Sequence, residues 1–66
     1  MTLGVRIAGL RRNKGVSLQK VADAVGVSKA HIWELEKERT TNPAMDLVRK
    51  LAVYYDTSVS FLVGED

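Results

Sequence analysis

The sequence predicts an all-α domain of five short helices that takes up residues 1–66. Apolar residues recur at intervals of three and four, as they do along one face of a helix. The chain lacks both a sustained alternation of apolar and polar residues and an Asn-Gly or Asp-Gly turn, the usual signals of a hairpin. With 45% apolar residues and no cysteine, the small core has to be built by packing helix on helix.

Glycines and serines mark the limits of the first three helices. Gly15 is placed to stop the first helix, and Gly26, which tolerates a positive φ, to stop the second. Ser17 and Ser28 are good N-caps for the second and third helices, and the third is expected to run to about Arg39. Their buried faces are expected to carry Leu3, Ile7, Leu10, Val21, Ala22, Val25, Ile32 and Leu35.

The last two helices have similar boundary signals. Asn42 as cap and Pro43 at the first position predict the start of the fourth helix, because proline has no N–H to satisfy there. Asp56-Thr57 is expected to end it, and Ser58 to cap the fifth helix. The apolar side chains expected to face inward are Leu47, Val48 and Leu51, with Tyr54 as a further candidate, and then Val59, Phe61, Leu62 and Val63.

Charge is unevenly distributed along the chain, although the net charge is only +2. The first third holds no acidic residue, while residues 21–66 hold all eight of them. Such polarity suits an anionic partner bound on one side, and an ordinary solvated basic helix is the alternative. The basic residues of the first third are Arg6, Arg11, Arg12, Lys14 and Lys20.

The second and third helices are so close in sequence that they are expected to cross steeply, leaving one face of the third helix in solvent. A protruding helix with a polar face fits the major groove of DNA. On a helical wheel, Ile32 and Leu35 mark the buried side of this helix. The residues expected to project outward are Ala30, Trp33, Glu34 and Lys37, with Lys29 on the flank.

The chemistry of these side chains suggests individual contacts with DNA. Lys29 can donate to guanine, Glu34 can accept from cytosine N4, and Ala30 can touch a thymine methyl group. Lys37 is better placed for phosphate. The N–H groups of the loop at residues 40–42 suit a phosphate as well, although a plain capped loop explains its composition equally.

Four residues on or near this helix have other interpretations. Trp33 can pack sideways against the first two helices, lie against a sugar or base, or contact another protein. His31 is interpreted as a flanking residue without a ligand. Arg11 and Glu36 are candidates for an ion pair between the first and third helices, which would fix the angle of the third helix if partly buried.

Several functional classes have no support in the sequence. No catalytic set, phosphate-binding loop or dinucleotide-binding motif is present, so neither an enzyme nor a bound cofactor is expected. With one histidine and no cysteine, no structural zinc site is expected. There is no apolar run long enough for a bilayer and no secretion signal, so a cytoplasmic protein is expected.

Taken together, these residues resemble the Cro-like helix-turn-helix regulators of the phage-repressor (XRE) family over about residues 3–63. The first helix carries the family pattern Leu-Gly-x-Arg-Ile-x-x-Leu-Arg between Leu3 and Arg11. The resemblance implies a lambda-repressor-like bundle whose helix-turn-helix unit spans about residues 17–39. The other matching residues are Gly15, Ser17, Ala22, Gly26, Val27, Ser28, Ile32, Glu36, Leu47, Leu51, Ala52, Ser58, Phe61 and Leu62.

The resemblance also implies a partner and a set of contacts. It implies a sequence-specific transcriptional regulator that binds double-stranded DNA as a homodimer, on half-sites about 34–36 Å apart. Base contacts are implied for Lys29, Ala30 and Glu34, beside Trp33. The implied phosphate contacts are Arg11, Ser17, Lys37, Thr41 and Asn42. The implied dimer surface comprises Val59, Ser60, Leu62 and Val63.

Two positions depart from the family pattern. Leu18 opens the second helix, where the family usually has a glutamine that contacts phosphate. The loop after the third helix contains Glu38, which repels phosphate unless Arg39 offsets it, and Arg39 is thus a further candidate for a phosphate contact. Both changes favour modest affinity or a helping partner. The alternative function is a protein-interaction module, antitoxin-like, on the same fold, and the chain is either a whole small regulator or part of a longer one.

Overall fold

The computed structural model describes residues 3–40 and 43–64, which form five helices and no strand. The all-α fold predicted from the sequence is thereby confirmed. The helices are α1 (Leu3–Lys14), α2 (Leu18–Val25), α3 (Lys29–Glu36), α4 (Met45–Tyr54) and α5 (Val59–Val63).

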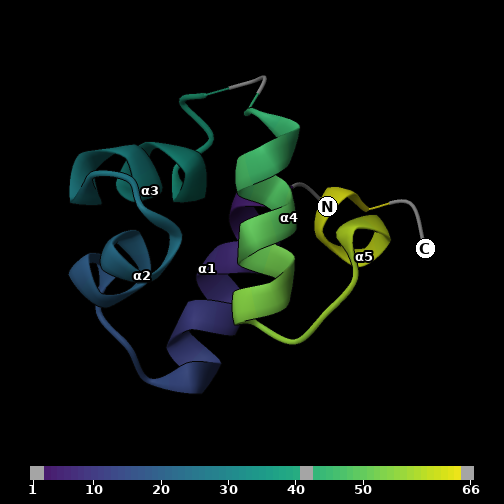
Figure 1. Cartoon of the computed structure of the whole chain (residues 1–66), viewed down its shortest axis with the longest axis horizontal. Helices are drawn as coiled ribbons and strands as arrows, with labels where there is room; N and C mark the ends of the chain where they lie inside the picture. The colour runs from purple at the N-terminus through teal and green to yellow at the C-terminus, as the bar shows by residue number, and fades with distance from the viewer. Residues whose placement is uncertain (1–2, 41–42, 65–66) are drawn as a thin grey trace.

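Helix α4 runs through the middle of the view in Figure 1, with α1 behind it, α2 and α3 on one side and α5 on the other. Helix α3 packs against α1 and α2, while α5 packs against α1 and α4. All five helices therefore contribute to one core, and α3 stands at its edge. The buried side chains of that core are Ile7, Val21, Ala22, Val25, Ile32, Leu35, Leu47, Val48, Leu51, Ala52 and Leu62.

The predicted helix boundaries are confirmed wherever a serine or glycine marks them. Each capping hydroxyl accepts the backbone N–H three residues further on, at 3.0 Å for Ser17, 3.1 Å for Ser28 and 3.0 Å for Ser58. Gly15 and Gly26 end α1 and α2 with φ values of 73° and 79°. These positive φ values carry little cost for glycine, which has no Cβ.

Helix α3 ends at Glu36, three residues before the end predicted near Arg39. Glu38 adopts a left-handed conformation with φ 61°. Its N–H donates to the carbonyl of Leu35 at 3.1 Å, and the N–H of Arg39 donates to the carbonyl of Glu34 at 2.9 Å. This pair of bonds is a Schellman turn, in which glycine is the usual left-handed residue. The prediction was wrong because no glycine marks the turn.

Helix α4 begins at Met45, so the predicted start with Pro43 at its first position is wrong. Ala44 is the N-cap, in an extended conformation with ψ 136° and no side-chain cap, so Pro43 lies before the helix. The fixed φ of proline suits extended chain as well as a first helical turn. Asp46 lies in the first turn, where a carboxylate is favourable beside the unpaired N–H groups. Asn42 lies outside the described residues.

Candidate nucleic-acid interface

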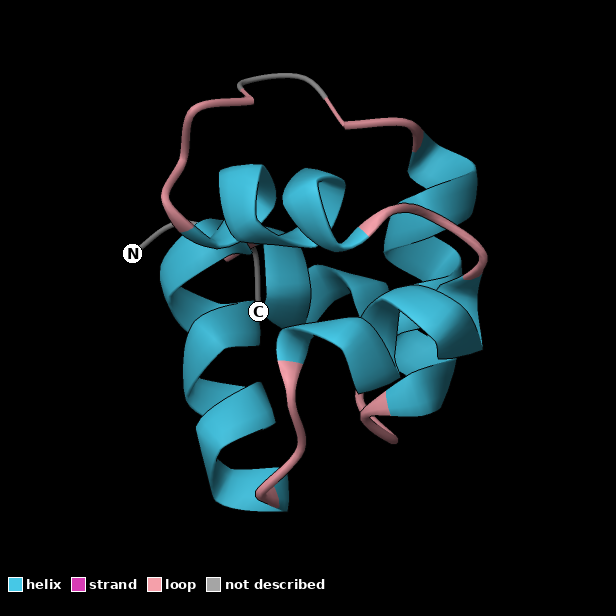
Figure 2. Cartoon of the chain, turned by 90° about the vertical axis from the view of Figure 1, so that its left-hand side faces the viewer, coloured by secondary structure: helices cyan, strands magenta, loops and turns pink. Residues whose placement is uncertain are grey.

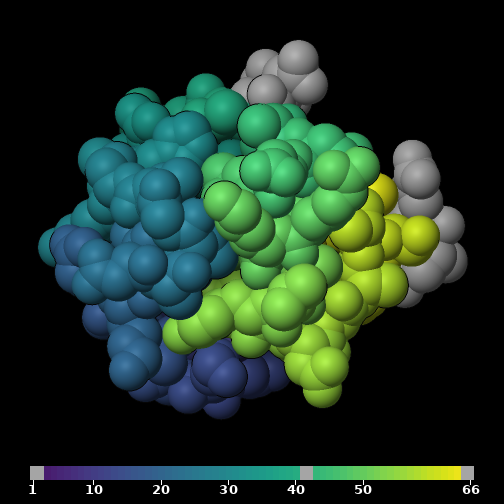
Figure 3. All heavy atoms as spheres, in the orientation of Figure 1, coloured from purple at the N-terminus to yellow at the C-terminus, as the bar shows by residue number. Residues whose placement is uncertain are grey.

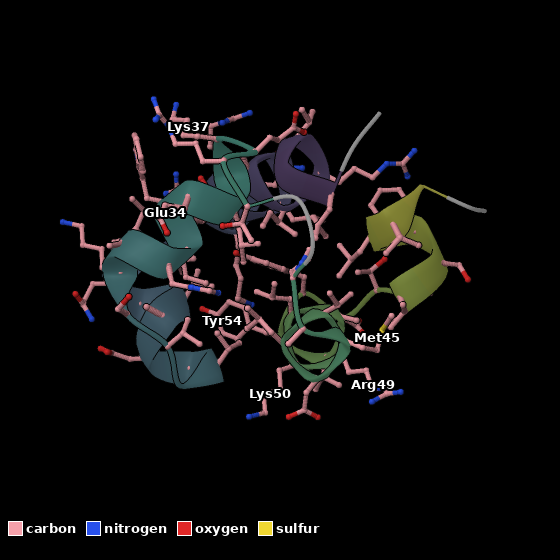
Figure 4. The ribbon with its side chains drawn as sticks, turned by 90° about the horizontal axis from the view of Figure 1, so that it is seen from above. Glu34, Lys37, Met45, Arg49, Lys50 and Tyr54 are labelled. Atoms are coloured by element: carbon pink, nitrogen blue, oxygen red, sulfur yellow. The ribbon has the colours of Figure 1, made fainter. Side chains whose placement is uncertain are left out.

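The outward side of α3 is an uncovered ridge, and Figure 2 looks onto the side of the molecule that α2 and α3 form. Ile32 and Leu35 are buried on the opposite side of the helix, as predicted. In Figure 4, Glu34 and Lys37 lie well apart from Met45, Arg49 and Lys50 of α4. The predicted helix phase is confirmed, because five side chains of what we call the α3 ridge are exposed: Lys29, Ala30, Trp33, Glu34 and Lys37.

The short turn before α3 places this ridge. The N–H groups of Gly26 and Val27 both donate to the carbonyl of Ala22, at 2.8 and 3.0 Å. Ser28 then caps α3, so one helix ends and the next begins within three residues. These bonds and the Ser28 cap do not involve the five ridge side chains, so the local sequence sets where α3 begins and leaves those side chains free to vary.

An ion pair holds the other end of α3. The Nε of Arg11 donates to Oε2 of Glu36 at 2.7 Å, and Nη2 donates to Oε1 at 3.1 Å. The predicted pairing of α1 with α3 is confirmed. The hydrogen bond to Glu36 raises the pKa of Arg11 above its ordinary value despite partial burial, so the guanidinium stays charged. A contact of Arg11 with phosphate remains a prediction.

Trp33 lies on the ridge and borders a groove that it shares with α1 and α2. It lines a groove of about 430 Å³ with Val5 and Ala8 of α1 and with Leu18 of α2. Sideways packing against the first two helices stays a prediction, because residues that line one groove need not touch each other. The side chain still exposes 39% of its surface, and the guanidinium carbon of Arg39 lies 5.1 Å from the centre of a ring of Trp33. Contacts with DNA or another protein stay predictions for the exposed part.

The basic residues of the first third do not act as one group. Arg6 turns toward α5, where its Nη1 donates to the carbonyl of Phe61 at 2.9 Å and its guanidinium carbon lies 4.4 Å from that ring's centre. Lys14 lies over the ring of Tyr54 at 5.2 Å. Arg12 instead lines the groove beside Trp33. Only part of the predicted basic surface is therefore near α3.

The structure corrects one residue of the expected dimer surface. Leu62 is fully buried in the chain's own core, so its side chain is not accessible to a second copy. Val59 and Val63 are half-buried and Ser60 is exposed, which leaves their role a prediction. Ser17 is exposed although its hydroxyl already caps α2.

The remaining expectations have mixed outcomes. Thr41 and Asn42, expected to contact phosphate, lie outside the described residues. His31 is half-buried beside the ridge. Across residues 3–40 and 43–64, no helix has the length and apolar character needed to cross a membrane.

Comparison with known proteins places this arrangement in a family. Residues 2–60 match the family described as "Helix-turn-helix domain". The transcriptional regulator SinR of Bacillus subtilis (strain 168) is 35% identical over 63 residues, which cover 96% of this chain and 57% of SinR. The chain thus spans little more than half the length of this relative.

Two solved structures have closely similar folds. SinR, named in its structure as the master regulator for biofilm formation in complex with DNA, has a TM-score of 0.85 and 34% identity, covering 92% of this chain and 97% of that one. The P22 c2 repressor bound to a synthetic operator has a TM-score of 0.92, covering 100% and 98%, and at 24% identity it establishes the fold alone. The five-helix architecture, the uncovered α3 ridge and the family match together identify this chain as a member of the helix-turn-helix domain family, of the Cro-like type.

Proposed function

We propose that this chain is the DNA-binding domain of a transcriptional regulator and reads the major groove with the α3 ridge. The observation that carries the proposal is that α3 buries Ile32 and Leu35 while its opposite side stays uncovered. That side combines a donor, an acceptor and a small apolar side chain, which is the chemistry needed to read base edges. The 34% identity to a SinR domain solved with DNA supports the same function.

Within this proposal each residue of the ridge has a distinct role. Lys29 donates to guanine, Glu34 accepts from cytosine N4, and Ala30 faces a thymine methyl group. The exposed part of Trp33 lies against the wall of the groove. The residues proposed to contact phosphate are Arg11, Ser17, Lys37 and Arg39, together with Thr41 and Asn42.

The proposed unit on DNA is a homodimer, with Val59, Ser60 and Val63 at the contact between copies. Its operator would have two-fold symmetry and half-sites about 34–36 Å apart. The expected cytoplasmic location belongs to the same proposal.

Selection from a random pool of duplex DNA tests the function. We expect one enriched, two-fold symmetric sequence whose log affinity falls linearly with log salt, by about 0.9 for each phosphate neutralised. A pool without enrichment would reject sequence-specific binding and favour the protein-interaction alternative. An enriched site without symmetry would reject the homodimer alone.

Glu34→Ala tests whether the ridge reads bases. The variant is expected to change the preferred base at one position in each half-site, with about 1–3 kcal/mol of discrimination lost. Asp46→Ala is the matched control, because it removes the same charge from an exposed position on α4. An unchanged preference in Glu34→Ala would remove Glu34 from the reading surface.

A further inference from the structure

The C-terminal turn of α3 lies directly against the backbone of α1 at Gly4, which is buried. A Cβ added to Gly4 would lie 2.4 Å from the carbonyl oxygen of Leu35 and 3.0 Å from that of Glu36. It would also lie 2.6 Å from Cγ of Glu38. No side chain larger than a hydrogen atom fits between α1 and α3 at this point.

The nature of the nearest atoms decides what must move. The side chain of Glu38 is flexible and can turn away. The carbonyl oxygens of Leu35 and Glu36 belong to the backbone of α3 itself. Relieving the contact at 2.4 Å therefore requires the backbone of α1 or of α3 to move by more than half an ångström at this point.

Gly4 and Arg11, at two positions along α1, both lie against Glu36 at the end of α3. The backbone of Glu36 lies near Gly4, while its carboxylate binds Arg11. Seven residues separate the two positions on α1, which corresponds to about 10 Å along a helix. Two such widely spaced contacts define both the depth and the angle of the end of α3.

We propose that Gly4 is a positioning residue for DNA reading, because its bare backbone sets how far the α3 ridge projects from the domain. This inference rests on the proposed function. Base recognition depends on hydrogen bonds that tolerate displacements of only about 0.5 Å, whereas attraction to phosphates depends on charge and falls slowly with distance. A side chain at position 4 should therefore weaken specific binding more than non-specific binding.

The same helix supplies a matched control. A Cβ added to Gly9 meets no atom within 4 Å, so Gly9→Ala adds the same methyl group to α1 without displacing α3. Alanine is also the better helix former, so this change should stabilise the domain. Three proteins are therefore compared: the wild type, Gly9→Ala, and the double variant Gly4→Ala/Gly9→Ala. In the double variant the stability gained at position 9 offsets part of the stability lost at position 4.

The experiment measures, for each protein, the affinity for the selected DNA site and for an unrelated duplex at the same salt concentration. We expect Gly9→Ala to keep the wild-type ratio of the two affinities. In the double variant the ratio of specific to non-specific affinity should fall about tenfold or more. Its affinity for the unrelated duplex should stay within about twofold of the wild-type value. Its Trp33 emission should shift as well, since Trp33 is the single tryptophan and belongs to α3.

The outcomes separate the two proposals. A wild type without preference for any site overturns the proposed function, and the positioning role with it. A specific wild type together with an unchanged ratio in the folded double variant overturns the positioning role alone. If circular dichroism shows that the double variant is unfolded, Glu38→Gly is added to both variants. This change relaxes the turn and removes the Cγ contact, but it leaves the contacts with the two carbonyl oxygens. The ratio of specific to non-specific affinity is then compared between these two proteins in the same way.

Discussion

Arg11 and Glu36 form a two-pronged ion pair in which the carboxylate exposes only 6% of its side-chain surface and the arginine 20%. The arginine also donates from Nη1 to the carbonyl of Val16 at 3.1 Å. One side chain therefore ties α1 to the end of α3 and to the turn that leads into α2. Because the pair is largely buried, either partner left alone would be a poorly solvated charge.

Glu36→Ala should therefore lower the free energy of unfolding by about 1–3 kcal/mol, as expected for the loss of hydrogen bonds to a charged group. The urea midpoint measures this change. Arg11→Met is measured alone and together with Glu36→Ala. The double variant should regain part of the stability that the single variants lose, since no buried charge is then left alone. A double variant whose loss equals the sum of the two single losses would mean that the pair is not coupled.

The core faces and most helix boundaries were predictable because their signals are local. Ser17, Ser28 and Gly26 act within three or four residues of their own position, and the spacing of Ile32 and Leu35 fixes the phase of α3. These signals depend on helix geometry alone, so they carry over from the sequence to the fold.

The features that escaped prediction depend on tertiary contacts. Helix propensity identifies Gly4 and Gly9 equally as weak points of the first helix, yet only Gly4 lies against another helix. Arg6 appears as part of a basic group until its bond to Phe61, 55 residues away in sequence, is known. For the ridge, the sequence predicted which side chains are exposed, but not the contacts of Trp33 with Arg39.

Stability should depend on pH in the alkaline range through Tyr55. Burial and the nearby Glu36 raise the pKa of this phenol from 10.0 to about 12. The unfolded chain then loses the proton at lower pH than the folded chain does. The free energy of unfolding should consequently fall as pH rises from about 10 to about 12. Below that range both states hold the proton, so Tyr55 adds no pH dependence there.

Tyr55→Phe isolates this contribution. Unfolding by urea at several pH values between 10 and 12 should give a shallower decline of the free energy of unfolding for the variant than for the wild type. Identical slopes would place the pKa of Tyr55 at its unfolded value.

Glu38→Gly should stabilise the domain by about 0.5–1 kcal/mol, because glycine adopts the left-handed conformation of the Schellman turn without the strain of a Cβ. Asp56 provides the matched control. It occupies the equivalent position after α4, with φ 54°. Aspartate tolerates this conformation better than glutamate, so Asp56→Gly should raise the thermal midpoint by less. A lower midpoint in Glu38→Gly would mean that its side chain, not its backbone conformation, matters to the turn.

Leu35→Ala should cost about 2–5 kcal/mol of stability, because Leu35 is almost completely buried and its truncation leaves a cavity behind the ridge. Val53→Ala is the comparison, since Val53 is 81% exposed on the outer face of α4, the helix at the front of Figure 3. That change should stay within about 0.5 kcal/mol. Urea unfolding measures both. If Leu35→Ala unfolds at the wild-type midpoint, the buried side of α3 is misassigned, and the outward direction of Glu34 and Lys37 with it.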